Sequence, residues 1–213
     1  MQIAVLLYDG FTALDCVGPY DVLSRLPGAD VVFVAAERGE VRTDTKMLAI
    51  VADRAIAEVT TPDILLIPGG FGTRRLMTDP STLDWIRTVH RHTTWTTSVC
   101  TGSLLLGAAG LLDGLDASTH WASRELLEST GARYVETRVV EQGKIVTAAG
   151  VSAGIDMALR LAARIGGDVT AQAIQLAIEY DPQPPYDCGS PSKASPELVA
   201  LVREFTAATE AAG

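Results

Sequence analysis

Apolar positions along the chain form short continuous runs that alternate with longer helical stripes. The runs at residues 2–8, 31–36, 63–67 and 94–99 have the length of strands, and few polar residues interrupt them. Continuous rather than alternating apolar residues are typical of strands that are covered on both faces. The pattern therefore predicts an α/β protein with a parallel sheet between two layers of helices.

Helical stripes fill the segments between these strands and continue after the last one. Pro19 lies inside the first stripe, so that helix is predicted to begin near it, where proline is tolerated. Asp79 or Ser81 is expected to cap the second helix. Helices are predicted at residues 11–26, 79–90, 104–109, 123–130, 150–166, 168–180 and 195–208.

Three segments depart from this alternation. Residues 38–53 are polar and predict a hairpin-like insert, and residues 138–147 predict two strands around a Gln-Gly turn. Residues 181–191 are rich in proline and cannot form regular structure. Because no repeat, low-complexity segment or linker interrupts the chain, we expect residues 1–213 to form a single domain.

Charge and cysteine content narrow the possible functions. A net charge of -9 argues against a surface for nucleic acid or an anionic membrane, and no apolar run approaches a membrane span. The first residues predict a strand rather than a secretion signal. Cys16, Cys100 and Cys188 lack metal-ligand spacing, so no metal site is predicted, and they suit a reducing cytoplasm. Cys16 is expected to be a buried apolar residue, whereas Cys188 could be buried or incidental.

Cys100 lies at the junction between a predicted strand and a predicted helix. A β-branched run ends at Val99, and Thr101-Gly102-Ser103 opens the next helix. Such a sharp turn lifts a side chain off the sheet and places it beside the helix N-terminus, as in a nucleophile elbow. The free N–H groups and the helix dipole there favour a thiolate. Cys100 is therefore the predicted nucleophile.

A glycine pair, Gly69-Gly70, follows a neighbouring strand. Ligands of open parallel sheets bind beyond the C-terminal ends of the strands. The N–H groups of Gly70 and Thr101 are candidates for an oxyanion hole. A tight turn is the alternative interpretation, and it would be preferred in the absence of Cys100. The stretch from Gly69 to Gly72 does not match GxGxxG, so no dinucleotide site is predicted.

The candidate acid–base partners of Cys100 are carboxylates and histidines. Asp15 follows the first strand among apolar residues, where burial would raise its pKa and let it act as general acid and then base. It could equally cap a helix, a role for which Asp21 is the rival. His120 is the histidine most able to face the same cleft, or it packs beside Trp121. His90 and His92 are expected only to complement a helix C-terminus.

Several stretches of the chain match a known pattern. They are Leu14-Asp15, Gly18-Pro19, Asp21-Val22-Leu23, Ile67-Pro68-Gly69-Gly70, Thr97 to Leu104, Gly107 to Leu112, Thr119-His120-Trp121, Gly154-Ile155-Asp156, Gln175-Leu176 and Glu179-Tyr180. Together they resemble the DJ-1/PfpI superfamily, for which a cysteine elbow with an acid at Asp15 is specific. The Ser98–Ser103 string, the Thr-His-Trp stretch and the segment from Glu179 to Pro185 resemble its isocyanide hydratase branch more narrowly.

This resemblance implies a flavodoxin-like three-layer sandwich, a homodimer and no cofactor. It also implies that Cys100 is the nucleophile and Asp15 the interacting acid, with Thr101 and Gly70 on the oxyanion side. Val151 matches a position whose backbone N–H approaches the nucleophile.

Other matched positions concern the substrate pocket. His120 matches a histidine near the cysteine in the DJ-1 branch, whereas the hydratase branch does not rely on a Cys-His-acid triad. Phe71 follows the glycine pair where a smaller residue would leave more room, so Phe71, His120 and Trp121 are candidate pocket residues. Whether residues 181–191 complete a partner's site stays open.

Two functional hypotheses of different classes follow. In the first, the protein hydrates an organic isocyanide to an N-substituted formamide through a Cys100 thioimidate, with Asp15 as general acid and base. In the second, it is a redox-sensing or regulatory module in which Cys100 is oxidised. Related domains are fused to DNA-binding regions in AraC-like regulators, but this chain has no basic helix-turn-helix segment. Glyoxalase-like chemistry on small electrophiles is a third possibility.

Overall fold

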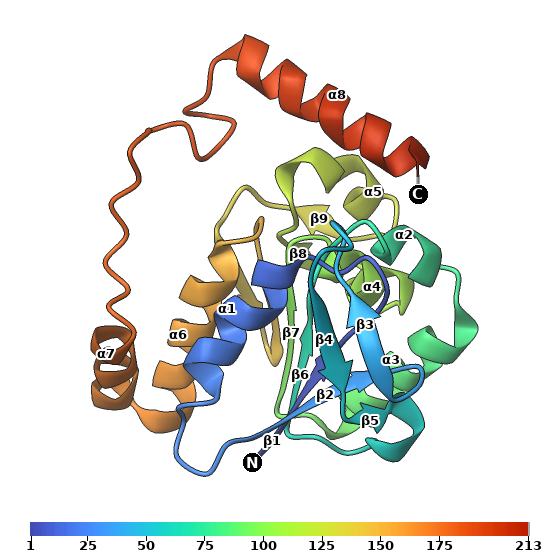
Figure 1. Ribbon diagram of the computed structural model, residues 1–213, viewed down its shortest axis with the longest axis vertical. Helices are drawn as coiled ribbons and strands as arrows, with labels where there is room; N and C mark the ends of the chain where they lie inside the picture. Colours follow the sequence, from blue (N-terminus) through green and yellow to red (C-terminus); the bar gives the residue numbers. More distant parts are fainter. Residues whose placement is uncertain (213) are drawn as a thin grey trace.

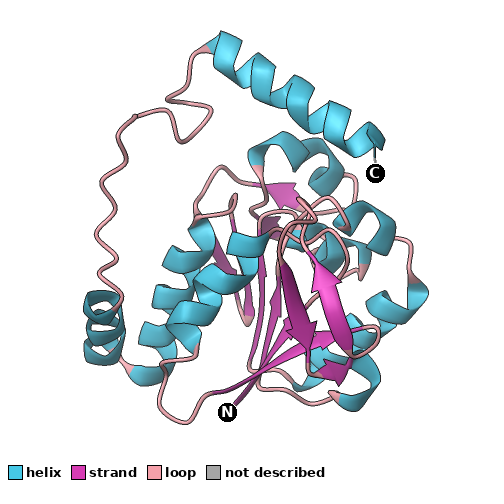
Figure 2. Ribbon diagram, viewed as in Figure 1, coloured by secondary structure: helices cyan, strands magenta, loops and turns pink. Residues whose placement is uncertain are grey.

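A twisted central sheet lies between two layers of helices in the computed structural model, which describes residues 1–212 (Figures 1 and 2). Its seven strands lie in the order β10-β11-β7-β6-β1-β2-β5. They are β1 (Gln2–Leu6), β2 (Asp30–Ala35), β5 (Arg54–Ala55), β6 (Ile64–Ile67), β7 (Trp95–Val99), β10 (Val139–Gln142) and β11 (Ile145–Ala148). All neighbours pair in parallel except β10 and β11, which are antiparallel.

The helices divide between the two faces of the sheet. In Figure 1, α1 (Ala13–Leu23), α6 (Ala153–Gly166) and α7 (Asp168–Ala177) lie on the left of the sheet. The other layer contains α2 (Thr73–Leu76), α3 (Pro80–His92), α4 (Gly102–Ala108) and α5 (Arg124–Glu128). This arrangement confirms the predicted α/β fold with a mostly parallel sheet.

Shorter strands and helical turns lie around this central sheet. The predicted insert is a hairpin of β3 (Gly39–Arg42) and β4 (Ala49–Ala52), and β8 (Asp116–Ala117) pairs with β9 (Arg133–Tyr134). Two single turns of 3-10 helix lie at Ile56–Glu58 and Trp121–Ser123. Sequence periodicity did not indicate β5, β8, β9 or the 3-10 turns, because two or three residues are too few to show a period.

The central strands are buried because apolar side chains cover both faces. Every residue of β6 is fully buried, as are the last four residues of β7. The apolar core is continuous from β1 to α7. The strand ends above this core are therefore rigidly placed, and they carry the candidate site.

Helix α1 differs from its prediction at the N-terminus. It begins at Ala13, six residues before Pro19, so the proline lies inside the helix. Two glycines, Gly18 and Gly154, bring α1 and α6 into close contact and explain why the helix tolerates the proline. A Cβ on Gly154 would lie 3.0 Å from Pro19 Cγ, and a Cβ on Gly18 would lie 3.0 Å from Ile155. Packing against α6 thus overrides the helix-breaking tendency of the proline.

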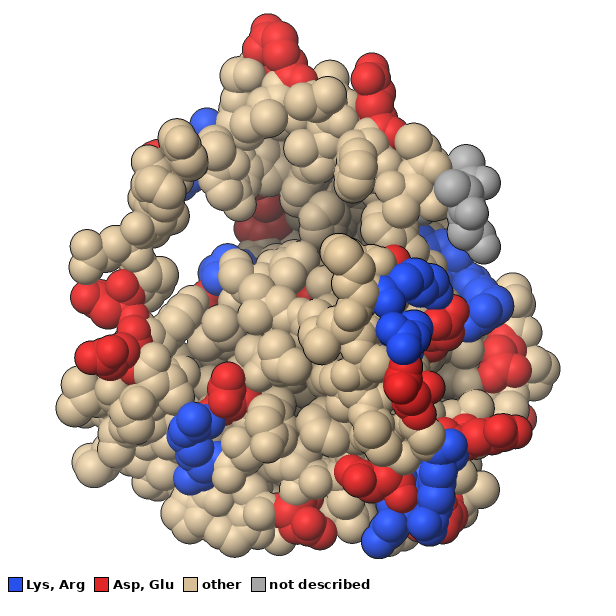
Figure 3. Space-filling model, viewed as in Figure 1, with Lys and Arg blue, Asp and Glu red and all other residues tan. Residues whose placement is uncertain are grey.

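The C-terminal part of the chain extends away from the sheet. Beyond α7, residues 178–195 run as an irregular and mostly exposed segment to α8 (Pro196–Ala212), which lies across the top of the molecule above α5 (Figure 1). The space-filling view shows an open gap between this segment and the body (Figure 3). No described helix is long and apolar enough to span a membrane.

The turn after Cys100 requires glycine at position 102. A Cβ there would lie 2.2 Å from the backbone oxygen of Ile67, which cannot move without disturbing β6. We expect Gly102→Ala to lower the free energy of unfolding by roughly 3 kcal/mol in urea titrations. Gly189→Ala is the control, because a Cβ there meets no atom within 4 Å, and its change should stay within about 0.5 kcal/mol. Equal effects of the two variants would contradict this account.

Candidate active site

Cys100 occupies a tight turn between β7 and α4. Its φ of 55° lies in the left-handed region, which a residue other than glycine rarely adopts. Hydrogen bonds on both sides of the residue hold this conformation: its N–H donates to the carbonyls of Ala148 and Ala149, and its carbonyl accepts from the hydroxyls of Ser103 and Thr119. The surrounding structure thus fixes the strained backbone that aims the thiol.

Asp15 reaches the same point from α1. Its side chain is 0% exposed, and Oδ2 accepts a hydrogen bond of 2.9 Å from the N–H of Gly69. The Cys100 thiol donates to this carboxylate. Oδ1 is buried and has no nitrogen or oxygen partner among the described residues, so its capacity to accept a hydrogen bond is unused.

Burial shifts the pKa values of both groups. Desolvation raises the pKa of Asp15 from 3.8 to about 7, although the Gly69 N–H and the Cys100 thiol oppose this shift. Burial, followed by the charge of Asp15, raises the pKa of the Cys100 thiol. The two groups share a buried space, so they titrate as a unit that we call the Cys100–Asp15 pair. Near neutral pH this pair keeps at least one proton.

Two backbone N–H groups act in the opposite direction on Cys100. Those of Val151 and Thr101 donate to the sulfur and lower its pKa. Val151 has a φ of 32°, a strained value for a β-branched residue. The sequence-based expectation of a thiolate counted such donors alone; the structure adds burial, which outweighs them.

The predicted oxyanion hole is not free in this geometry. The N–H of Gly70 donates to Thr101 Oγ1 at 2.9 Å, and the N–H of Thr101 is directed at the Cys100 sulfur. Gly69 gives its N–H to Asp15. The glycine pair therefore serves close packing: a Cβ on Gly69 would lie 2.8 Å from the Cβ of Cys100 and 2.7 Å from Asp15 Oδ2.

A cavity of about 230 Å³ opens above Cys100. Of the three predicted pocket residues, Phe71 and His120 line it and Trp121 does not. Val151, Gly70 and Thr101 also face this space. The lining is completed by Thr12, Asp44, Arg74, Ser123, Val202, Phe205 and Thr206.

His120 is placed as a wall of the pocket and has no hydrogen bond to Cys100 in the described part of the chain. Its Nδ1 accepts from the N–H of Ala122 at 3.3 Å, and its ring packs against the backbone at Gly150. Burial, together with the charge of Arg74, lowers the pKa of His120, so it is neutral at physiological pH. These contacts favour the packing interpretation.

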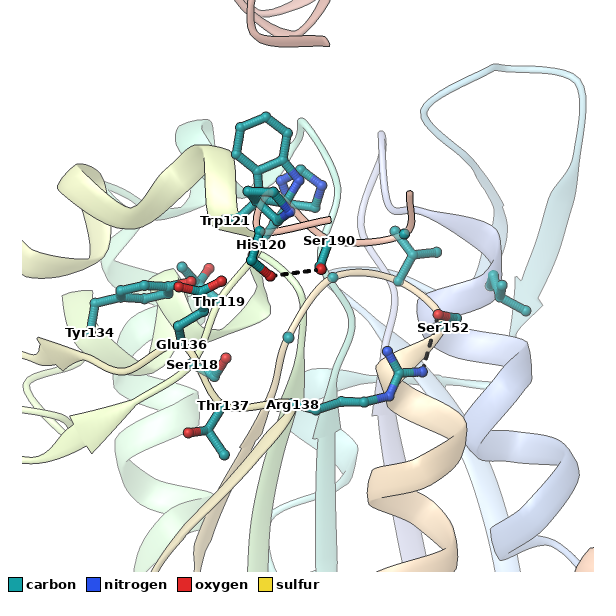
Figure 4. A pocket seen from close by; sticks show the side chains of 17 residues that line it. Ser118, Thr119, His120, Trp121, Tyr134, Glu136, Thr137, Arg138, Ser152 and Ser190 are labelled. Carbon is teal, nitrogen blue, oxygen red and sulfur yellow. Dashed lines mark hydrogen bonds between the residues drawn. The ribbon is translucent and has the colours of Figure 1, made fainter. Parts of the chain in front are cut away.

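A larger cavity of about 520 Å³ lies on the other side of His120 (Figure 4). Trp121 lines this cavity instead, with its ring centroid 5.6 Å from that of His120 and the two ring planes tilted by 31°. Arg138 also faces it, donates to Ser152 and pairs with Asp156, next to the first turn of α6. Residues 189–192 of the C-terminal segment form its outer wall.

The other candidates from the sequence lie elsewhere. Cys16 is buried beside Asp15, and its pKa is raised to about 12, mainly by burial. Asp21 pairs with Arg25 at the surface, and Cys188 is exposed in the irregular segment. Among residues 1–212, no group of three or more His, Cys, Asp or Glu side chains is arranged to hold a metal ion.

The contribution of α8 was missed by sequence reasoning. Val202 and Phe205 lie about a hundred residues after Cys100, and no motif links them to it. The amphipathic pattern of α8 indicated a buried face, but it carried no information on which surface that face covers.

The raised pKa of Asp15 predicts a stability that falls with pH. The carboxyl binds its proton more tightly in the folded state, where its pKa is about 7, than in the unfolded chain, where the pKa is 3.8. Its contribution to the free energy of unfolding is therefore full below pH 4 and is lost as pH rises through about 7. The shift corresponds to a free energy on the order of 4 kcal/mol. Asp15→Asn cannot ionise, so in urea titrations at about pH 5.5 and 8 it should lose less stability than the wild type. Parallel losses in the two proteins would contradict the shift.

Comparisons with known proteins identify the family to which this fold belongs. Residues 1–164 match the model of the DJ-1/PfpI family. The chain is 44% identical over 207 residues to an isonitrile hydratase of Pseudomonas putida, covering 97% of this chain and 90% of the relative. It is 30% identical to the transcriptional regulator CdhR of Pseudomonas aeruginosa, but it spans only 53% of that protein's length.

Solved structures support the same assignment. A ThiJ/PfpI family protein from Pseudomonas syringae superposes with a TM-score of 0.93 at 38% identity, covering 98% of this chain and 87% of that one. The DJ-1 superfamily protein STM1931 from Salmonella typhimurium gives a TM-score of 0.75 at 28% identity, covering 85% of this chain and 99% of that one. On its sequence and its fold alike, the chain belongs to the DJ-1/PfpI family.

Proposed function

We propose that the protein is a cofactor-independent isocyanide hydratase, which converts R–NC and water into the formamide R–NH–CHO. The observation that carries the proposal is the buried Cys100–Asp15 pair, whose cysteine lines a small pocket. The similarity to an isonitrile hydratase over nearly the whole chain supports the choice of reaction.

In the first step, the terminal isocyanide carbon receives both a sulfur and a proton. The Cys100 sulfur forms the C–S bond, and the proton of the pair passes through the Asp15 carboxyl to the same carbon. The product is a thioimidate, R–N=CH–S, and Asp15 is left as a carboxylate. A carboxyl and a thiol that together keep at least one proton supply both the sulfur and the proton that this step consumes.

In the second step, water adds to the thioimidate carbon. The Asp15 carboxylate accepts a proton from the water and passes it to the thioimidate nitrogen, so it is again a carboxylate when the tetrahedral intermediate has formed. The tetrahedral intermediate, R–NH–CH(OH)–S, then expels the sulfur to give the formamide, and the pair recovers its proton. Asp15 Oδ1 has no nitrogen or oxygen partner among the described residues, so one carboxylate oxygen retains the capacity to accept a hydrogen bond from this water.

The alternative functions have less support. A redox sensor needs an accessible thiolate, whereas Cys100 is 5% exposed and burial raises its pKa. Relatives such as CdhR are about twice as long as the matched region, and net charge -9 does not favour nucleic acid. For glyoxalase-like chemistry, the N–H groups at Gly70 and Thr101 that would stabilise an oxyanion are already engaged.

The proposal extends to the state of the protein in the cell. We propose a homodimer of single-domain subunits, 1–213, in the cytoplasm. Apolar side chains are exposed at Leu14 on α1, at Val169 and Leu176 on α7 and at Tyr186 in the irregular segment. Three free cysteines suit a reducing compartment.

Removal of the thiol should abolish turnover. With cyclohexyl isocyanide as substrate, Cys100→Ala should lower kcat/KM by about 10³-fold or more, and Asp15→Asn by about 10²-fold or more, measured as N-cyclohexylformamide by chromatography. Cys188→Ser is the matched control, because this exposed cysteine lies outside the pocket, and it should keep wild-type activity. No formamide from the wild type, or equal formation by Cys100→Ala, would refute the proposal.

The oligomeric state is tested separately. Sedimentation equilibrium should give a mass of about 45 kDa, twice the 22.5 kDa of the chain. Leu176→Glu, which places a charge on the exposed face of α7, should shift the population toward the single chain. A wild-type mass near that of one chain at micromolar concentration would contradict the dimer.

A further inference from the structure

Helix α8 forms the outer wall of the pocket above Cys100. Val202 and Phe205 of this helix line the cavity together with Phe71 from the turn after β6. In Figure 1, α8 lies across the end of the molecule at which the C-terminal ends of the parallel strands gather. An element far away in the sequence thus faces the reactive sulfur.

The position of α8 depends on contacts just outside the pocket. The guanidinium of Arg203 lies over the Trp121 ring at 5.6 Å. Val202 and Thr206 are half-buried, whereas Leu201 is 61% exposed and is not part of the lining. The helix therefore has one side toward the pocket and another toward solvent.

Most of the hydroxyl groups that line the pocket already donate a hydrogen bond to another atom of the protein. The hydroxyl of Thr12 donates to Asp44, that of Thr101 to the carbonyl of Gly70, and that of Thr206 to the carbonyl of Val202. The Ser123 hydroxyl accepts from Arg74. A ligand thus meets few hydroxyl donors that are not already committed, which disfavours polar substituents.

The apolar part of the pocket has room for a bulky group. The volume of about 230 Å³ is below the ~300–1,000 Å³ of drug-sized sites, so it suits a small molecule. Phe205 is 70% exposed although it faces the cavity, so a bound apolar group would cover part of its ring. Burial of such surface is favourable in proportion to its area.

We propose that Val202 and Phe205, with Phe71, bind the R group of the isocyanide, and that α8 thereby selects ring-sized apolar R groups over short ones. The proposal deepens the hydratase function and rests on it for the identity of the ligand. The reaction itself takes place at Cys100 and Asp15, so α8 acts on selectivity.

The first test compares two substrates in three proteins. The double variant Val202→Ala/Phe205→Ala should lower kcat/KM for cyclohexyl isocyanide by about tenfold or more, and for ethyl isocyanide by less than about threefold. Leu201→Ala is the matched control: it removes an apolar side chain from the same helix outside the pocket, and it should leave the ratio of the two constants unchanged. An equal change of the ratio in both variants, or no change in either, overturns the proposal.

A second test does not depend on isocyanide turnover. Cys100 is alkylated with N-ethylmaleimide and with N-cyclohexylmaleimide, and both rates are measured by peptide mass spectrometry. The exposed Cys188 in the same molecule gives the intrinsic ratio of the two reagents. Relative to Cys188, Cys100 should prefer the cyclohexyl reagent by about fivefold or more, and this preference should fall toward unity in Val202→Ala/Phe205→Ala.

The two tests separate the two claims. A cyclohexyl preference at Cys100 without turnover of any isocyanide would overturn the hydratase function and keep α8 as a selective wall. Turnover of isocyanides with no preference at Cys100 in either assay would keep the hydratase function and overturn the role of α8.

Discussion

One buried carboxyl and one buried thiol, holding at least one proton near neutral pH, are the constraint on which the rest of the site depends. Asp15 has no exposed surface and Cys100 almost none, so ionisation of either is opposed by the loss of solvation. The N–H groups of Gly69, Val151 and Thr101 donate to the pair and partly compensate for the charge that remains. Chemistry that delivers one proton and one sulfur to the same atom matches what such a pair holds.

Bringing these two groups together imposes requirements on the fold around them. Gly69 must lack a side chain because Asp15, Cys100 and Thr101 occupy the space, and Gly102 must lack one because the end of β6 lies against it. Cys100 and Val151 both adopt positive φ values, which the hydrogen bonds at Cys100 and the packing of α6 maintain. The stability of the sheet and its two helical layers thus supports local strain at the point of reaction.

Most of the fold could be predicted from the sequence, since continuous apolar runs and helical stripes report burial directly. The elbow at Cys100 was predictable for the same reason, because a strand, a cysteine and a small-residue helix start are adjacent in the chain. The protonation state of the thiol could not be predicted in this way, since the thiol is buried by α1, β6 and α6, which are far apart in sequence. The engagement of the Gly70 N–H by Thr101 was equally hidden, because residue types do not reveal the partner of a backbone donor.

The same burial also bears on the order of the reaction. The buried Cys100 thiol is shielded from oxidants and other electrophiles, and it is reached through the space beneath α8. An apolar molecule that enters this space displaces water while sulfur and proton are transferred, and a water is needed only afterwards. In the proposed mechanism, the Cys100–Asp15 pair gives its proton to the substrate in the first step and is left with the Asp15 carboxylate, which accepts hydrogen bonds strongly. The first step therefore leaves Asp15 in the state that the proposed second step requires, as a base for the attacking water.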